Sequence, residues 1–258
     1  MLAEDWKQLK YAKDILENPG IASKIAAAVG MPIEGVLNRL PAKWSGRIQS
    51  ITHKSLKHAL DIAVLTINRR GKRATASNRN HKLAAAVSGG LGGALGVVTL
   101  VFELPVTTVI MFRSIADIAR SEGEDIGTIE AKVACMEVFA LGGKSESDNS
   151  SETGYYTARA LLAREISEAA KYLAGKGLAE KGAPVLARFA TAVASRFSPI
   201  VAQKVAASAV PIVGAVGGAL INTIFMNHFQ DMARGHFIIR RLERNYGREE
   251  VQKQYADA

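Results

Sequence analysis

The chain has 258 residues, which is enough to bury a sizeable core in one large domain or two small ones. Hydrophobic residues make up 48% and charged residues 22%, and the formal net charge is +9. This charge content excludes a polytopic membrane protein, and the single cysteine excludes an intrachain disulfide. The basic balance leaves three alternatives: an anionic lipid surface, a nucleic acid, or no specific partner.

Short helices are predicted at the N-terminus. Apolar residues at helical spacing predict a helix over Ala3–Glu17, a second over Ile21–Val29 and a turn or third helix over Pro32–Leu37. The first residues, MLAEDWKQLKY, contain early acids and no apolar run, so they do not predict a secretory signal peptide. We expect residues 1–43 to form N-terminal helices that precede a larger helical domain over residues 44–258.

A strongly amphipathic helix is predicted over Trp44–Asn68, and a basic segment without acids, Arg69–Lys82, follows it. This segment is either a solvated connector or an anchor for anionic headgroups, to which each Lys or Arg contributes about 1 kcal/mol. Nucleic acid is the less favoured partner because no aromatic residue is interleaved for base stacking. The basic residues expected to contact an anionic membrane here are Arg69, Arg70, Lys72 and Arg73.

The first apolar stretch, Leu83–Phe112, contains one charge, Glu103, and a run of glycines between residues 89 and 96. Such a stretch is long enough to span a bilayer or to run through a large helical core. Its glycines let another backbone or a lipid come close. Pro105 predicts a kink or a helix restart. A charged helix then continues to Glu122.

The middle of the chain predicts further helices. One covers Ile129–Leu141 with Thr128 as its N-cap, and a polar segment over residues 144–153 predicts a mobile loop. Two more helices are predicted over Gly154–Leu173 and Pro184–Phe197, with another starting at Ser198-Pro199.

A second uncharged stretch, Val205–Met226, is interrupted by Pro211 and three glycines and runs into a charged helix, Asn227–Gly247. Two short motifs recur: Gly-Gly-Ala-Leu at 92–95 and 217–220, and Asp-x-Ala-Arg at 117–120 and 231–234. The sequence therefore predicts an all-α fold, a multi-helix bundle with two central glycine-rich apolar helices.

Catalytic signatures are missing from the sequence, which has no phosphate loop, GxSxG elbow, HExxH helix or CxxC pair. The candidate residues are polar side chains inside apolar runs, because a buried carboxylate requires a partner or a shifted pKa. Such groups form a structural network, the polar end of an apolar lipid cavity, or a catalytic set of Glu103 with Glu137 or His228. The partner expected for such a buried carboxylate is Arg113 or Arg234. The residues expected to bind a lipid headgroup are Arg113, Asp117, Asn222, Asp231, Arg234 and His236, and no metal or cofactor is expected.

The chain resembles the EcsC family of bacterial proteins over roughly Trp44 to Tyr255. The resemblance is carried by Glu103-Leu104-Pro105, by Arg113–Asp125, by Cys135–Gly143 and above all by Pro211–Gly247. Members are often described as membrane-associated, and the family's name comes from a gene beside those of an ABC transporter. The resemblance brings no established catalytic residues with it.

The leading expectation is a non-catalytic helical protein that binds lipid or another apolar ligand. It would be cytoplasmic and peripheral to, or shallowly inserted in, the inner membrane, with Arg241 and Arg244 also facing anionic headgroups. One alternative is a lipid-directed hydrolase or modifying enzyme that uses Glu103, Glu137 and His228. The other is a cytoplasmic adaptor of a membrane transporter or protease.

Overall fold

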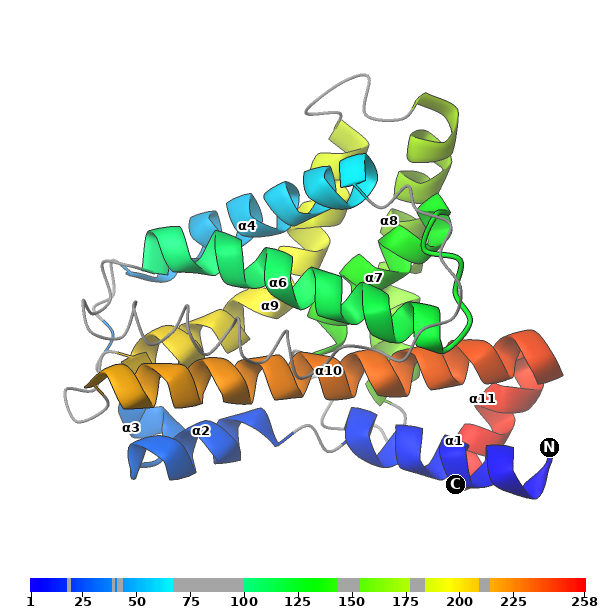
Figure 1. The fold of residues 1–258 in the computed structure, drawn as a ribbon, viewed down its shortest axis with the longest axis horizontal. Coiled ribbons are helices and arrows are strands. Elements are labelled where there is room, and N and C mark those ends of the chain that lie inside the picture. The colour runs from blue at the N-terminus through cyan, green and yellow to red at the C-terminus, as the bar shows by residue number, and fades with distance from the viewer. Residues whose placement is uncertain are drawn as a thin grey trace.

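The computed structural model describes residues 1–17, 20–38, 40, 44–66, 100–142, 154–176, 184–208 and 214–258. All the regular secondary structure in these residues is helical, which confirms the all-α class (Figure 1). The helices are α1 (Ala3–Glu17), α2 (Ile21–Val29), α3 (Ile33–Leu37), α4 (Trp44–Thr66), α6 (Leu100–Ser121), α7 (Ile129–Leu141), α8 (Gly154–Lys176), α9 (Pro184–Ser208), α10 (Gly214–Tyr246) and α11 (Arg248–Asp257).

The long helix α10 is the axis of the fold. Its 33 residues extend about 50 Å at 1.5 Å per residue. Helices α1 and α2 pack on one side of it, and α6, α7 and α9 pack on the other (Figure 1). The helices contribute to one hydrophobic core, so the predicted N-terminal helices share that core with the rest of the chain.

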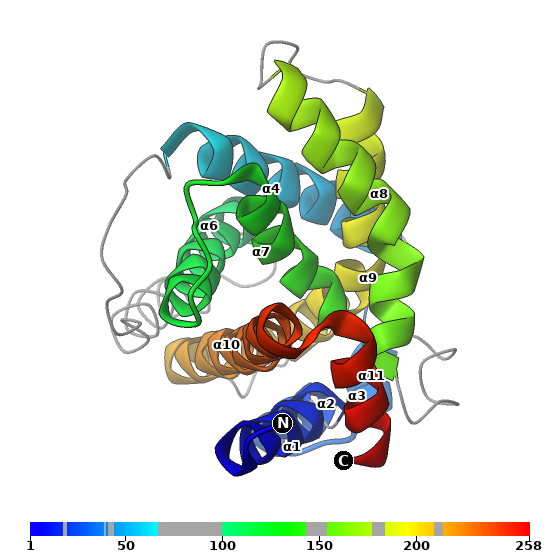
Figure 2. The ribbon, with the colours of Figure 1, turned by 90° about the vertical axis from the view of Figure 1, so that its right-hand side faces the viewer.

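Helices α6 and α10 run parallel and side by side (Figure 1), and Figure 2 shows both on its left-hand side. Two hydrogen bonds set their register: Asn222 Nδ2 donates to Glu103 Oε1 at 2.9 Å, and Gln230 Nε2 donates to Ser114 Oγ at 2.8 Å. The described parts of the two apolar stretches therefore meet. The glycine run at 89–96, the basic segment at 69–82 and the loop at 144–153 lie outside the described residues, so those predictions stay untested.

Two prolines lie inside helices. Helix α6 continues through Pro105, so the predicted restart there is wrong. Pro105 lies in the second turn, where a missing N–H leaves only one carbonyl near the helix start without its usual partner. Helix α9 likewise continues through Pro199, so a new helix does not begin at Ser198. Pro199 is exposed, and water can satisfy the carbonyl that its ring leaves unpaired.

Helix α1 approaches α10 closely at Gly235. A Cβ at this position would lie 2.7 Å from Leu16 Cγ and 3.1 Å from Ile15 Cγ1. Those atoms are near the α1 backbone and cannot swing away, because Leu16 is buried in the core. The missing side chain thus allows α1 to pack directly on α10.

Replacing Gly235 with alanine is expected to lower the free energy of unfolding by about 1–3 kcal/mol, because overpacking outweighs the higher helix propensity of alanine. Gly175→Ala in α8 is the matched control, since no atom lies within 4 Å of a Cβ built there. That change is expected to be neutral or to stabilise by up to about 1 kcal/mol. Urea unfolding of both variants measures the difference, and equal effects would contradict the close approach.

Candidate functional site

A buried polar cluster joins α6, α9 and α10 at the end of the molecule where α6 and α10 begin. Glu103 Oε1 accepts hydrogen bonds from Lys204 Nζ at 2.7 Å and from Asn222 Nδ2 at 2.9 Å. The side chains of Lys204 and Glu103 are 1% and 10% exposed. Burial lowers the pKa of Lys204, although the charge and hydrogen bond of Glu103 oppose that shift. We call Glu103, Lys204 and Asn222 the three-helix cluster.

Sequence reasoning proposed the wrong partner for Glu103. Neither Arg113 nor Arg234 pairs with it, and Lys204 does. A signal for this pair was present: Lys204 is the one charge between residues 197 and 226, just as Glu103 is the one charge between residues 83 and 112. Two lone charges of opposite sign in two apolar stretches predict a buried ion pair, because each charge requires a partner.

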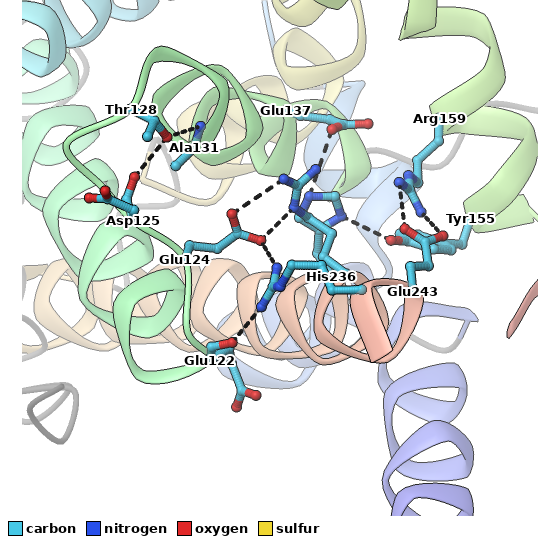
Figure 3. Close-up of polar contacts among 12 residues, drawn as sticks. Glu122, Glu124, Asp125, Thr128, Ala131, Glu137, Tyr155, Arg159, His236 and Glu243 are labelled. Carbon is cyan, nitrogen blue, oxygen red and sulfur yellow. Dashed lines mark hydrogen bonds and ion pairs between the residues drawn. The ribbon is translucent and has the colours of Figure 1, made fainter. Parts of the chain in front are cut away.

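A second buried cluster, the histidine cluster, joins α7, α8 and α10 (Figure 3). His236 is fully buried, with its Nδ1 2.9 Å from Tyr155 Oη and its Nε2 3.7 Å from Glu137 Oε2. Burial, and then the positive charges of Arg159 and Arg240, hold the pKa of His236 well below its usual range. Burial raises the pKa of Glu137, against the pull of the same two arginines. Both shifts favour the uncharged forms.

Beside the histidine cluster, an ion pair ties α8 to α10 (Figure 3). Arg159 Nη1 and Nη2 donate to the two oxygens of Glu243 at 2.7 and 3.1 Å. Tyr156 Oη adds a hydrogen bond to Glu243 at 3.3 Å. This bidentate geometry is the strong form of an arginine–carboxylate contact, and the two side chains are only 10% and 11% exposed.

The loop between α6 and α7 is held by arginines of α10. Glu124 accepts from Arg240 Nε at 2.9 Å and from Arg244. Arg241 lies 3.4 Å from Glu122 Oε2 and also bonds Gln8. Burial alone would raise the pKa of Glu124, but Arg240 and Arg244 hold it below its ordinary value. Arg241 and Arg244, predicted as membrane contacts, therefore bind groups of the protein itself.

The catalytic candidates are not gathered in one place. Glu103 contacts Asn222 and Glu137 contacts His236, and these two α10 positions are fourteen residues, or about 21 Å, apart along the helix. His228 Nε2 instead donates to the carbonyl of Gly142 at 3.0 Å, at the end of α7. A hydrolase that uses Glu103 and Glu137 together requires both carboxylates in one cleft, and this geometry does not provide it.

The other predicted ligand residues lie on the outer faces of α6 and α10, apart from Asn222 and His236, which are buried. The exposed and half-buried positions of the two helices follow the same spacing, and each α10 position comes 114 residues after its α6 counterpart. Ion pairs form within each helix, Arg120 to Asp117 at 3.2 Å and Arg234 to Asp231 at 3.4 Å. We call these faces the twin stripes: Val106, Ile110, Arg113, Asp117 and Arg120 on α6, and Leu220, Ile224, Asn227, Asp231 and Arg234 on α10.

The recurring Asp-x-Ala-Arg motif thus falls on adjacent, parallel helices in corresponding places. The model of the EcsC protein family matches residues 14–242, which include the buried clusters and the twin stripes. The chain belongs to the EcsC protein family. The family match begins inside α1, so the family region extends well before Trp44. Neither a curated protein nor a solved structure gives a significant match to this chain.

The histidine cluster of this EcsC protein predicts a specific pH dependence. Below about pH 6.5 the unfolded chain takes up a proton on His236 that the folded chain refuses, so this residue makes stability fall as pH falls. Glu137 acts in the opposite direction, because the folded chain keeps its proton at a pH where the unfolded chain has lost it.

We therefore expect the stability advantage of wild type over His236→Gln to shrink between pH 7 and pH 5, by up to about 1.4 kcal/mol per pH unit. The difference between wild type and Glu137→Gln is expected to change with the opposite sign. Urea unfolding at a series of pH values measures both, and two differences that do not vary with pH would contradict the assignment.

Proposed function

We propose that this EcsC protein is a non-catalytic, peripheral membrane protein that binds lipid through the twin stripes. One observation carries the proposal: both stripes are apolar at the same end, where Val106 is 53% exposed and Leu220 is 47% exposed. Large side chains so exposed on two adjacent helices are unusual for a surface that meets only water, and they suit shallow insertion among acyl chains.

The charged half of the twin stripes fits the same arrangement. Arg113 is exposed and lies seven residues, or about 10 Å, beyond Val106 along α6. A surface that inserts its apolar end would bring this guanidinium, and then Arg120 and Arg234, to the level of lipid phosphates. Each such charge near an anionic surface contributes about 1 kcal/mol.

Shallow insertion suits this chain better than a membrane span. Among the described helices, α9 alone is long and apolar enough to cross a bilayer, and 44% of its most apolar window is buried. It packs against α4, α7 and α8 and holds the buried Lys204. The core helix of a soluble protein passes the same test, so α9 carries no argument for a span.

Flotation with vesicles tests the proposal. Phosphatidylcholine vesicles with and without an anionic phospholipid, at low and high salt, are expected to bind the wild-type protein, most strongly when anionic and at low salt. The double variant Val106→Asp/Leu220→Asp is expected to lose about tenfold or more in vesicle affinity, because it puts two charges where apolar area would be buried.

Leu161→Asp is the matched control, because Leu161 is 61% exposed but lies on α8, away from the twin stripes. Its binding is expected to equal that of wild type. A wild-type protein that stays unbound in all four conditions, or an equal loss in the control, would overturn the proposal. Recovery of a membrane complex without any vesicle binding would favour the adaptor alternative instead.

A further inference from the structure

We infer that the three-helix cluster is a binding site for a hydrogen-bond-donating lipid headgroup, with Glu103 Oε2 as the acceptor. This inference rests on the proposed membrane association and names the chemistry of the group that would be recognised. It is carried by the geometry of one carboxylate whose two oxygens have different surroundings.

The two donors of the cluster converge on a single oxygen. Lys204 Nζ and Asn222 Nδ2 both bind Glu103 Oε1, at 2.7 and 2.9 Å. Within the described part of the chain, no hydrogen bond reaches Glu103 Oε2. Oε2 is not one of the fully buried side-chain atoms that lack a partner, so it is accessible from outside the protein, and a donor that arrives there can bind it.

The carboxylate also lies beside the proposed membrane surface. Glu103 precedes Val106 by three residues, so the two side chains share a face of α6. The corresponding position in α10, 114 residues later, is Gly217, which adds no side chain. The repeated surface therefore has one acceptor of this kind, at its apolar end.

Charge selects the class of ligand. Lys204 already compensates Glu103, so the cluster as a whole is close to neutral. A phosphate approaching the outward oxygen of Glu103 would be repelled, whereas an N–H or O–H group would donate to it. The site therefore fits a primary ammonium or a hydroxyl and discriminates against choline, whose quaternary nitrogen has no N–H.

Vesicle binding by the full chain tests the site. Phosphatidylcholine vesicles with a fixed fraction of an anionic phospholipid are the reference. In the two mixed vesicles, an equal part of the phosphatidylcholine is replaced by phosphatidylethanolamine or by diacylglycerol. The first replacement supplies an ammonium donor and the second a hydroxyl donor. Wild type is expected to bind at least one of the mixed vesicles about tenfold more tightly than the reference vesicles, the value of one charge-assisted hydrogen bond.

The readout in each variant is the affinity for the mixed vesicles divided by the affinity for the reference vesicles. Glu103→Gln is expected to bring this ratio to about one, and so is Glu103→Gln/Lys204→Met, which also removes the buried charge in case the single variant unfolds. Glu130→Gln, at an exposed position of α7, is the control and is expected to keep the wild-type ratio.

A wild-type ratio of one, or a ratio that survives in both Glu103 variants, would overturn the inference while leaving the proposed membrane association intact. A failure of the proposed function looks different, because wild type would then bind none of the three vesicles.

Discussion

Replacing Glu103 with leucine is expected to lower the free energy of unfolding by about 3–5 kcal/mol, because Lys204 then keeps a buried charge without its partner. Lys204 has little chance to reach water, since its side chain is 1% exposed and lies over the Phe225 ring, 5.5 Å from the centroid. Asn222 would also lose its acceptor, Glu103 Oε1.

A double-mutant cycle distinguishes the interaction from simple loss of packing. Lys204→Met alone is expected to cost a similar amount, because it leaves Glu103 buried and unpaired. The double variant Glu103→Leu/Lys204→Met is expected to recover most of the loss, since an apolar pair of similar volume replaces a buried ion pair with little cost or a gain. Urea unfolding measures all four proteins, and strictly additive losses would contradict the coupling.

The second large effect is expected at Arg159. Substitution by methionine is expected to cost about 3–5 kcal/mol, because Glu243 is left 11% exposed and without its bidentate partner. Arg159→Lys keeps the charge but not the fork of two donors, so it is expected to cost an intermediate amount. The pair links α8 to α10, and both helices are expected to lose hydrogen-exchange protection together.

Arg164→Met provides the control for Arg159. Arg164 lies five residues further along α8 and pairs with Glu168, but its side chain is 81% exposed. Its replacement is expected to leave stability nearly unchanged, because water screens such pairs. Chemical unfolding of the three variants gives the comparison, and equal losses at Arg159 and Arg164 would show that burial does not determine the energy.

The local elements of this EcsC protein could be predicted from the sequence. The bounds of α1, α2 and α7 agree with those predicted from apolar spacing and caps. Thr128 caps α7 as predicted, with its Oγ1 accepting from Ala131 N at 3.3 Å. These features depend on residues within one or two turns of each other, and the sequence contains that information directly.

The prolines show where a local rule fails. Pro199 is a favourable first residue for a helix, yet α9 passes through it. Packing on both sides of the proline decides this, because Phe197 and Ile200 are both buried in the core. Tertiary burial of a continuous helix outweighs one missing hydrogen bond when the affected carbonyl can reach water.

The partners of the charged residues could not be predicted. Arg241 and Arg244 read as free surface charges, but the loop that follows α6 approaches them from more than a hundred residues away. Tyr155 and Arg159 were not predicted as partners in buried polar contacts for the same reason. Nothing near them in the sequence shows that His236 and Glu243 are their neighbours.

The sequence by itself determined the helical class, most helix positions and the two apolar stretches, because hydrophobic periodicity and turn residues act over short distances. Only the tertiary structure decided that α6 and α10 lie parallel, that Glu103 meets Lys204, and that the two copies of Asp-x-Ala-Arg fall in corresponding places on adjacent helices. Those contacts join residues about a hundred positions apart, and their geometry follows from how whole helices pack, which spacing along the chain does not encode.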